Sequence, residues 1–81
     1  MKRIVYSKAA VKVLTRMQPS QSRRIRSAIA SYAAGEPVDV RPLSGPAFVR
    51  IRVGRWRVII DDDGTVILVL KVGARGDVYK N

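Results

Sequence analysis

Residues 48–61, FVRIRVGRWRVIID, decide the fold of this chain of 81 residues. Apolar and basic residues alternate on both sides of a Gly-Arg pair at 54–55, and this alternation is typical of two half-buried β-strands. A two-residue turn with glycine in its first central position fixes the register of such a hairpin. In that register Arg52 faces Arg57, and Arg50 lies on the same surface. The predicted core surface consists of Val49, Ile51, Val53, Trp56, Val58 and Ile60.

The arginine surface of this hairpin is unusual for a solvated strand face. Like charges directly opposite one another destabilise a hairpin by a few tenths to ~1 kcal/mol. Three arginines in one register, with no acid interspersed, therefore favour a surface that binds an anion. The planar guanidinium group suits phosphate better than a lysine ammonium does.

Charge and composition restrict the partners further. The chain has 16 Lys and Arg against 6 Asp and Glu, a net charge of +10, and residues 1–35 contain eight basic residues and no acid. This charge suits a polyanion, most simply nucleic acid, or a partner with an acidic segment. Cysteine is absent, which excludes disulfides and thiol chemistry. No apolar run approaches ~18 residues, so we expect neither a membrane span nor secretion.

The rest of the chain predicts one α+β domain over residues 1–81, because its length allows a single modest core. Apolar stripes at helical spacing predict two helices that form a hairpin and pack on one face of a mostly antiparallel sheet of three to four strands. The expected elements are, in order, an N-terminal strand at 2–6, a helix after the cap Ser7, a helix from Pro19 that Gly35 ends, a loop at 36–47, strands at 48–53, 56–61 and 65–72, and a short edge strand at 77–79.

The second turn, at 62–64, predicts the faces of the strand that follows it. The sequence Asp-Asp-Gly fits a three-residue hairpin with a G1 bulge. We therefore expect Lys71 beside the arginines, together with Ile67 and Val69. The expected core residues of this strand are Val66, Leu68, Leu70 and Val72.

Residues 50–81, RIRVGRWRVIIDDDGTVILVLKVGARGDVYKN, resemble the C-terminal half of the RelE toxins of the RelE/ParE superfamily. The opening strand, SKAAVKVLTRM, the helix after Pro19 and VRPLSG agree, so the likeness covers nearly the whole chain. Its most specific parts are VGRWRVII and the VGAR…VY ending. The resemblance implies a cytoplasmic, ribosome-dependent endoribonuclease that cuts mRNA in the A site on a concave basic sheet face. It also implies an antitoxin that wraps and blocks the enzyme, in a toxin–antitoxin hetero-oligomer.

The resemblance implies which residues of this sequence correspond to the functional residues of the family. The family's basic pair on the first hairpin strand matches Arg50 and Arg52, and its arginine after the aromatic residue matches Arg57. The arginine of the VG-x-R loop matches Arg75, and the C-terminal tyrosine matches Tyr79.

Two positions depart from the family pattern. Ala74 stands where Lys or His is usual, and Gly76 replaces a second basic residue. Acid–base roles at these two positions are therefore missing.

The residue inventory limits the chemistry of such a site. The chain has no His and a single Glu, Glu36. The run Asp61-Asp62-Asp63 precedes Gly64, which favours turn chemistry over a metal site. We expect cleavage without metal or cofactor, in which the 2′-OH of the RNA attacks the adjacent phosphate and the protein stabilises the added charge. The expected catalytic residues are Arg57, Arg75, Tyr79 and Arg52, and the expected RNA-binding residues are Arg50, Arg52, Arg55 and Lys71.

Roles within this set differ. Arg57 and Arg75 are expected on the scissile phosphate, because its charge grows in the transition state. Tyr79 is the titratable candidate for the base, since neighbouring cations lower the pKa of a phenol, or it stacks on a nucleobase.

Two other functions stay open. A ParE-like inhibitor of DNA gyrase shares the fold and acts by binding a protein. A catalytically degenerate homologue would bind RNA or antitoxin without cleavage. Retention of the basic set and Tyr79 favours the nuclease, and the departures at Ala74 and Gly76 keep the degenerate alternative open.

Overall fold

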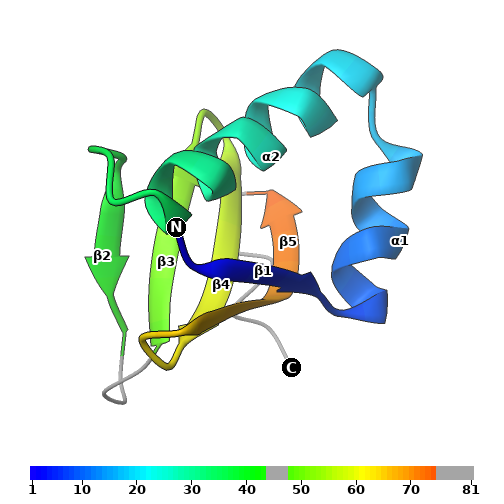
Figure 1. Cartoon of the computed structure of the whole chain (residues 1–81). Helices are drawn as coiled ribbons and strands as arrows, with labels where there is room; N and C mark the ends of the chain where they lie inside the picture. The colour runs from blue at the N-terminus through cyan, green and yellow to red at the C-terminus, as the bar shows by residue number, and fades with distance from the viewer. Residues whose placement is uncertain (44–47, 75–81) are drawn as a thin grey trace.

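The computed structural model describes residues 1–43 and 48–74, which form a five-stranded sheet with two helices on one side (Figure 1). The predicted α+β class is confirmed, as is the order of an N-terminal strand, two helices and then a run of strands. The strand order in the sheet is β1-β5-β4-β3-β2, and all neighbours are antiparallel except β1 and β5. The elements are β1 (Arg3–Tyr6), α1 (Lys8–Arg16), α2 (Pro19–Ala33), β2 (Val40–Pro42), β3 (Phe48–Val53), β4 (Trp56–Asp62) and β5 (Val66–Ala74).

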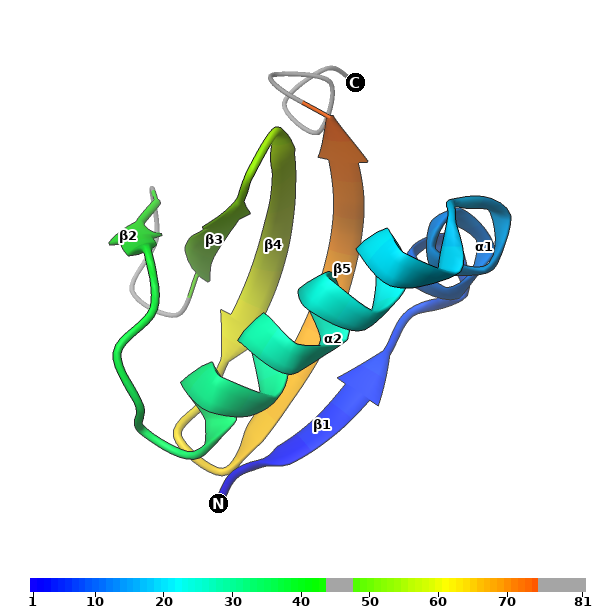
Figure 2. The same cartoon turned by 90° about the horizontal axis from the view of Figure 1, so that it is seen from above.

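The helices begin and end where their local chemistry predicts. The Ser7 side chain accepts a hydrogen bond from the Ala10 N–H at 3.1 Å and so caps α1. Pro19 opens α2, and Gly35, with φ of +79°, follows its end. Seen from above, α2 lies diagonally across the sheet and α1 flanks it (Figure 2). No helix in the described part of the chain is long and apolar enough to cross a membrane.

The predicted hairpin register is confirmed, because Arg52 pairs with Arg57 and Val53 with Trp56. One face of this hairpin packs against the helices. Trp56 is half-buried against this core, so it does not lie on the arginine surface. The fully buried large side chains come from both helices and three strands: Leu14, Ile25, Ile29, Ile51, Val58, Ile60, Ile67 and Val69.

The expectation that residues 36–47 form only loop is wrong. Val40–Pro42 pairs with β3 as an edge strand, with Arg41 directly opposite Arg50. The Arg52 N–H donates to the Asp39 carbonyl, so the backbone of Asp39 is bonded to β3. In an antiparallel pair only every second residue forms such bonds, and Pro42 is therefore one of the residues whose backbone polar groups point away from β3. Proline is tolerated there because its missing N–H removes no ladder bond. The strand expected at 77–79 lies outside the described residues.

The side-chain faces of β5 differ from the prediction over its first half. Ile67 and Val69 are buried in the core, where the sequence predicted them beside the arginines. Val72 is buried and Lys71 pairs with Ile59 on the arginine surface, both as predicted. The residues wrongly predicted to face the core are Val66, Leu68 and Leu70.

A bulge inside β5 explains this difference. Pairing with β4 runs regularly to Ile60 opposite Val69 and resumes with Ile59 opposite Lys71, so Leu70 is the extra residue. Ser7 holds the bulge in place, because its hydroxyl donates to the Leu70 carbonyl at 2.8 Å and its N–H to the Val69 carbonyl at 3.0 Å. The extra residue therefore lies where β1 meets α1 and not at the turn.

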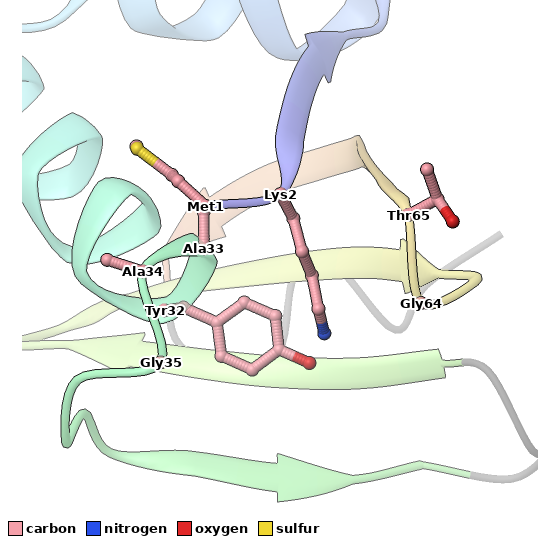
Figure 3. Close-up of a pocket in the computed structure, with 8 residues that line it drawn as sticks. All are labelled: Met1, Lys2, Tyr32, Ala33, Ala34, Gly35, Gly64 and Thr65. Atoms are coloured by element: carbon pink, nitrogen blue, oxygen red, sulfur yellow. The ribbon is translucent and has the colours of Figure 1, made fainter.

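A polar cluster around Asp62 joins the start of β1, the end of α2 and the β4–β5 turn. Figure 3 shows three of the residues that bond to Asp62, which are Lys2, Tyr32 and Gly64. Asp62 accepts hydrogen bonds from Lys2 Nζ at 2.7 Å, from the Tyr32 hydroxyl at 2.6 Å and from the Gly64 N–H at 2.9 Å. Burial alone raises the pKa of Asp62, but these hydrogen bonds outweigh it and lower the pKa below the ordinary value of 3.8. Burial, the hydrogen bond to Asp62 and its negative charge raise the pKa of Tyr32 to about 12.

We expect Tyr32 to make the free energy of unfolding depend on alkaline pH. The phenol has a folded-state pKa of about 12 against an ordinary 10.0, so its stabilisation is present below pH 10 and is lost as pH rises toward 12. The stability advantage of the wild type over Tyr32→Phe should therefore narrow across this window, as measured by chemical denaturation. Tyr6→Phe is the control, because the Tyr6 ring lies under Arg26, away from Asp62. A constant difference between the wild type and Tyr32→Phe contradicts this role.

Candidate nucleic-acid interface

Four adjacent strands place basic side chains on the sheet face opposite the helices. Arg41 of β2, Arg50 of β3 and Lys71 of β5 lie in one cross-strand row that passes through Ile59 of β4. The next row along the strands pairs Arg52 with Arg57. We call this set the basic face: Arg41, Arg50, Arg52, Arg57 and Lys71.

The basic face concentrates positive charge at short range. Directly opposite residues in a sheet have Cβ atoms about 4.5–5.5 Å apart, so Arg41–Arg50 and Arg52–Arg57 are close pairs of like charge. Arg50 and Arg57 are half-buried, and the other three members are exposed. The Lys2–Asp62 ion pair lies apart from this face, because Asp62 also accepts a hydrogen bond from Tyr32 at the end of α2. Close like charges of this kind favour the binding of an anion.

The structure brings together four of the residues predicted for the site: Arg50, Arg52, Arg57 and Lys71. Arg55 is exposed at the β3–β4 turn, beyond the second row. The two remaining predicted residues, Arg75 and Tyr79, lie outside the described residues. Their roles stay predictions.

Two basic residues near this surface were missed. Arg41 belongs to the basic face because β2 pairs with β3 as an edge strand, within the alternating sequence V-D-V-R at 38–41. The alternation of these residues was the available signal, which the neighbouring prolines obscured. Arg24 of α2 reaches the β3–β4 turn, where a Cβ added to Gly54 would lie 3.7 Å from its guanidinium. No sequence pattern places Arg24 there.

The side chains of the three consecutive aspartates, residues 61–63, lie in three different environments. Asp63 accepts hydrogen bonds from the Thr65 and Val66 N–H groups at 2.9 and 2.8 Å, and these bonds lower its pKa. Asp62 joins the polar cluster with Lys2 and Tyr32 described above. Asp61 pairs with Phe48 and points to the same side of the sheet as the basic face. Turn chemistry therefore accounts for Asp62 and Asp63 but not for Asp61.

Comparison with solved structures gives close matches over nearly the whole chain. A chain of the archaeal RelE–RelB complex from Pyrococcus horikoshii is 30% identical, with a TM-score of 0.73, and the match covers 94% of this chain and 97% of that one. The RelB–RelE antitoxin–toxin complex from Methanococcus jannaschii matches at 25% identity and a TM-score of 0.74, covering 93% and 94%. The DinJ–YafQ complex from E. coli shares the fold at 13% identity, with a TM-score of 0.78 and 98% of each chain covered. No protein-family profile and no curated protein sequence matches.

Proposed function

Because this chain belongs to the RelE-type toxins of toxin–antitoxin systems, we propose that it is an endoribonuclease that cuts mRNA on the ribosome and thereby inhibits translation. The observation that carries this proposal is the basic face, where two adjacent cross-strand rows hold four arginines and a lysine. Its place of action is then the ribosomal A site in the cytoplasm. The ribosome supplies the positioning that so small an enzyme lacks.

The proposed reaction uses the RNA's own nucleophile. The 2′-oxygen attacks the adjacent phosphorus, the bond from phosphorus to the 5′-oxygen breaks, and the 2′-proton leaves while the 5′-oxygen gains one. The products are a 2′,3′-cyclic phosphate and a 5′-hydroxyl. Arg57 and Arg75 stabilise the phosphate as its charge grows, and Arg52 assists them. Arg50, Arg52, Arg55 and Lys71 bind the flanking phosphates.

A base is needed for the 2′-proton, and Tyr79 is the proposed group. A guanidinium cannot take up this proton, because it stays protonated at any accessible pH. If Tyr79 stacks on a nucleobase instead, Tyr79→Phe keeps that contact and loses only the hydroxyl.

The proposed partner is a cognate antitoxin, because two of the matching structures are complexes of a toxin with its antitoxin. The net charge of +10 and the acid-free residues 1–35 favour an antitoxin segment that is acidic and folds on binding. The assembly is then a toxin–antitoxin hetero-oligomer.

The proposed function is tested by mapping mRNA cut sites on programmed ribosomes with purified protein. We expect cuts within the A-site codon, fragments ending in a 2′,3′-cyclic phosphate, and no change on adding a divalent-metal chelator at a magnesium level that keeps the ribosomes intact. Free RNA should be cut poorly, because it lacks the ribosome's positioning. Chelator-sensitive cutting of naked RNA contradicts the metal-free mechanism. Intact mRNA together with inhibited gyrase supports the ParE-like function, and binding without cleavage supports the degenerate one.

A further inference from the structure

A third cross-strand row lies beside the basic face and differs from it in chemistry. Phe48 of β3, Asp61 of β4, Leu68 of β5 and Val5 of β1 are paired in turn, so their side chains share the sheet face opposite the helices. Phe48 and Val5 are each 39% exposed, although both are large apolar side chains. An aromatic ring and a carboxylate are therefore direct neighbours, with Cβ atoms about 4.5–5.5 Å apart.

Asp61 is the feature of this row that the basic face does not explain. It is the only acidic residue that the five described strands place on this side of the sheet. Asp61 is half-buried, and its carboxylate makes no hydrogen bond or ion pair with the rest of the described chain. A carboxylate next to a phosphate-binding surface weakens the attraction for phosphate. The Asp61 carboxylate therefore suits a different kind of ligand, one that donates hydrogen bonds to it.

Nucleobases meet this requirement where their edges carry N–H groups. A carboxylate has two acceptor oxygens and binds two parallel donors as a fork. The Watson–Crick edge of guanine presents two neighbouring donors, N1–H and the 2-amino group. An exposed aromatic ring such as Phe48 supplies the surface on which an unpaired base stacks.

We propose that Phe48 and Asp61 form a base-recognition subsite for an unpaired guanine, in RNA whose phosphates lie on the basic face. The proposal rests on the proposed function in taking RNA as the ligand. Arg50 and Lys71 flank Ile59, one row from Asp61, so a strand held there by its phosphates can turn a base onto Phe48. An acidic protein segment is the poorer occupant of this row, because Asp61 would repel it.

The test measures binding without cleavage, so that it does not depend on catalysis. The probes are 2′-O-methyl RNA pentamers with a central guanine, inosine or uracil in a uridine background, and affinity is measured by fluorescence anisotropy. Inosine lacks only the 2-amino group of guanosine. We expect the wild type to bind the guanine pentamer about 10-fold more tightly than the inosine pentamer. Asp61→Asn should bring this ratio close to one and slightly tighten binding of all three RNAs, because a negative charge is lost.

Two further variants separate recognition from charge and fold. Glu36→Gln removes one exposed negative charge after α2 and should keep the guanine-to-inosine ratio. Phe48→Ala should weaken binding of all three pentamers about 5-fold or more through lost stacking. Phe48→Leu preserves the apolar cover of the sheet and should show the same direction of change. Thermal denaturation confirms that each variant is folded.

The contrary results are equally specific. Equal affinity of the wild type for guanine and inosine, or a ratio that survives Asp61→Asn, overturns the subsite. RNA binding indifferent to Phe48→Ala, with self-association of the protein lost in sedimentation velocity, shows instead that the row is a protein contact. A guanine preference that persists while programmed ribosomes stay uncut leaves the subsite standing and removes the proposed nuclease.

Discussion

Arg57→Ala is expected to slow single-turnover mRNA cleavage on the ribosome by about 10²–10³-fold, equivalent to ~2.7–4 kcal/mol of barrier. This is the cost of losing one preorganised donor to a charge that develops in the transition state. Binding to the ribosome should change much less, because the proposed contacts of Arg50 and Lys71 with the flanking phosphates are untouched by this substitution. The substitution should therefore lower the cleavage rate at saturating enzyme, while the enzyme concentration that gives half of the maximal rate stays nearly the same.

The fold should tolerate this substitution. Arg57 lies directly opposite Arg52. Removing one of two facing like charges should leave thermal stability unchanged or raise the free energy of unfolding by a few tenths to ~1 kcal/mol. Arg23→Ala is the matched control, since Arg23 is exposed on α2 and its removal changes net charge equally. Wild-type cleavage rates in Arg57→Ala, measured on saturated ribosomes, would show that the site assignment is wrong.

Asp62→Ala is expected to lower the free energy of unfolding by about 2–3 kcal/mol, which is about 10–20 °C in Tm for a domain of this size. The carboxylate is 9% exposed and accepts from Lys2, Tyr32 and Gly64, so its loss leaves a phenol and an ammonium without their acceptor. Lys2 is 36% exposed, and solvent screening therefore reduces the share of the ion pair. Most of the loss should come from the hydrogen bond to Tyr32.

A double-mutant cycle of Asp62→Ala with Tyr32→Phe tests how much of the lost stability comes from the hydrogen bond between the two side chains. The two substitutions should couple by about 0.5 kcal/mol or more, because they remove the same hydrogen bond. Asp39→Ala, which removes an exposed carboxylate before β2, should stay within ~0.5 kcal/mol of the wild type. Additive losses in the cycle would mean that Asp62 stabilises the fold through Lys2 and Gly64 alone.

Much of the site was predictable because it depends on local rules. A two-residue turn leaves no freedom in register, so the Arg52–Arg57 pair and the core face of the first hairpin followed from residues 48–61 alone. Arg41 was not predictable in the same way. Its place on the basic face depends on a segment that leaves α2, folds back and pairs with β3, and this pairing depends on the finished sheet.

The β4–β5 pair shows most clearly which features the local sequence determines and which depend on tertiary structure. Composition and alternation determined the charge, the α+β class, the helix caps and the hairpin, since each depends on residues close together in the chain. The position of the bulge was decided by tertiary structure, because Ser7 bonds Leu70 across 63 residues of sequence. That contact turns Ile67 and Val69 into the core and leaves Leu68 beside Asp61 on the open face. A one-residue shift reverses every side chain of a strand, so only the folded chain could place Leu68 beside Asp61.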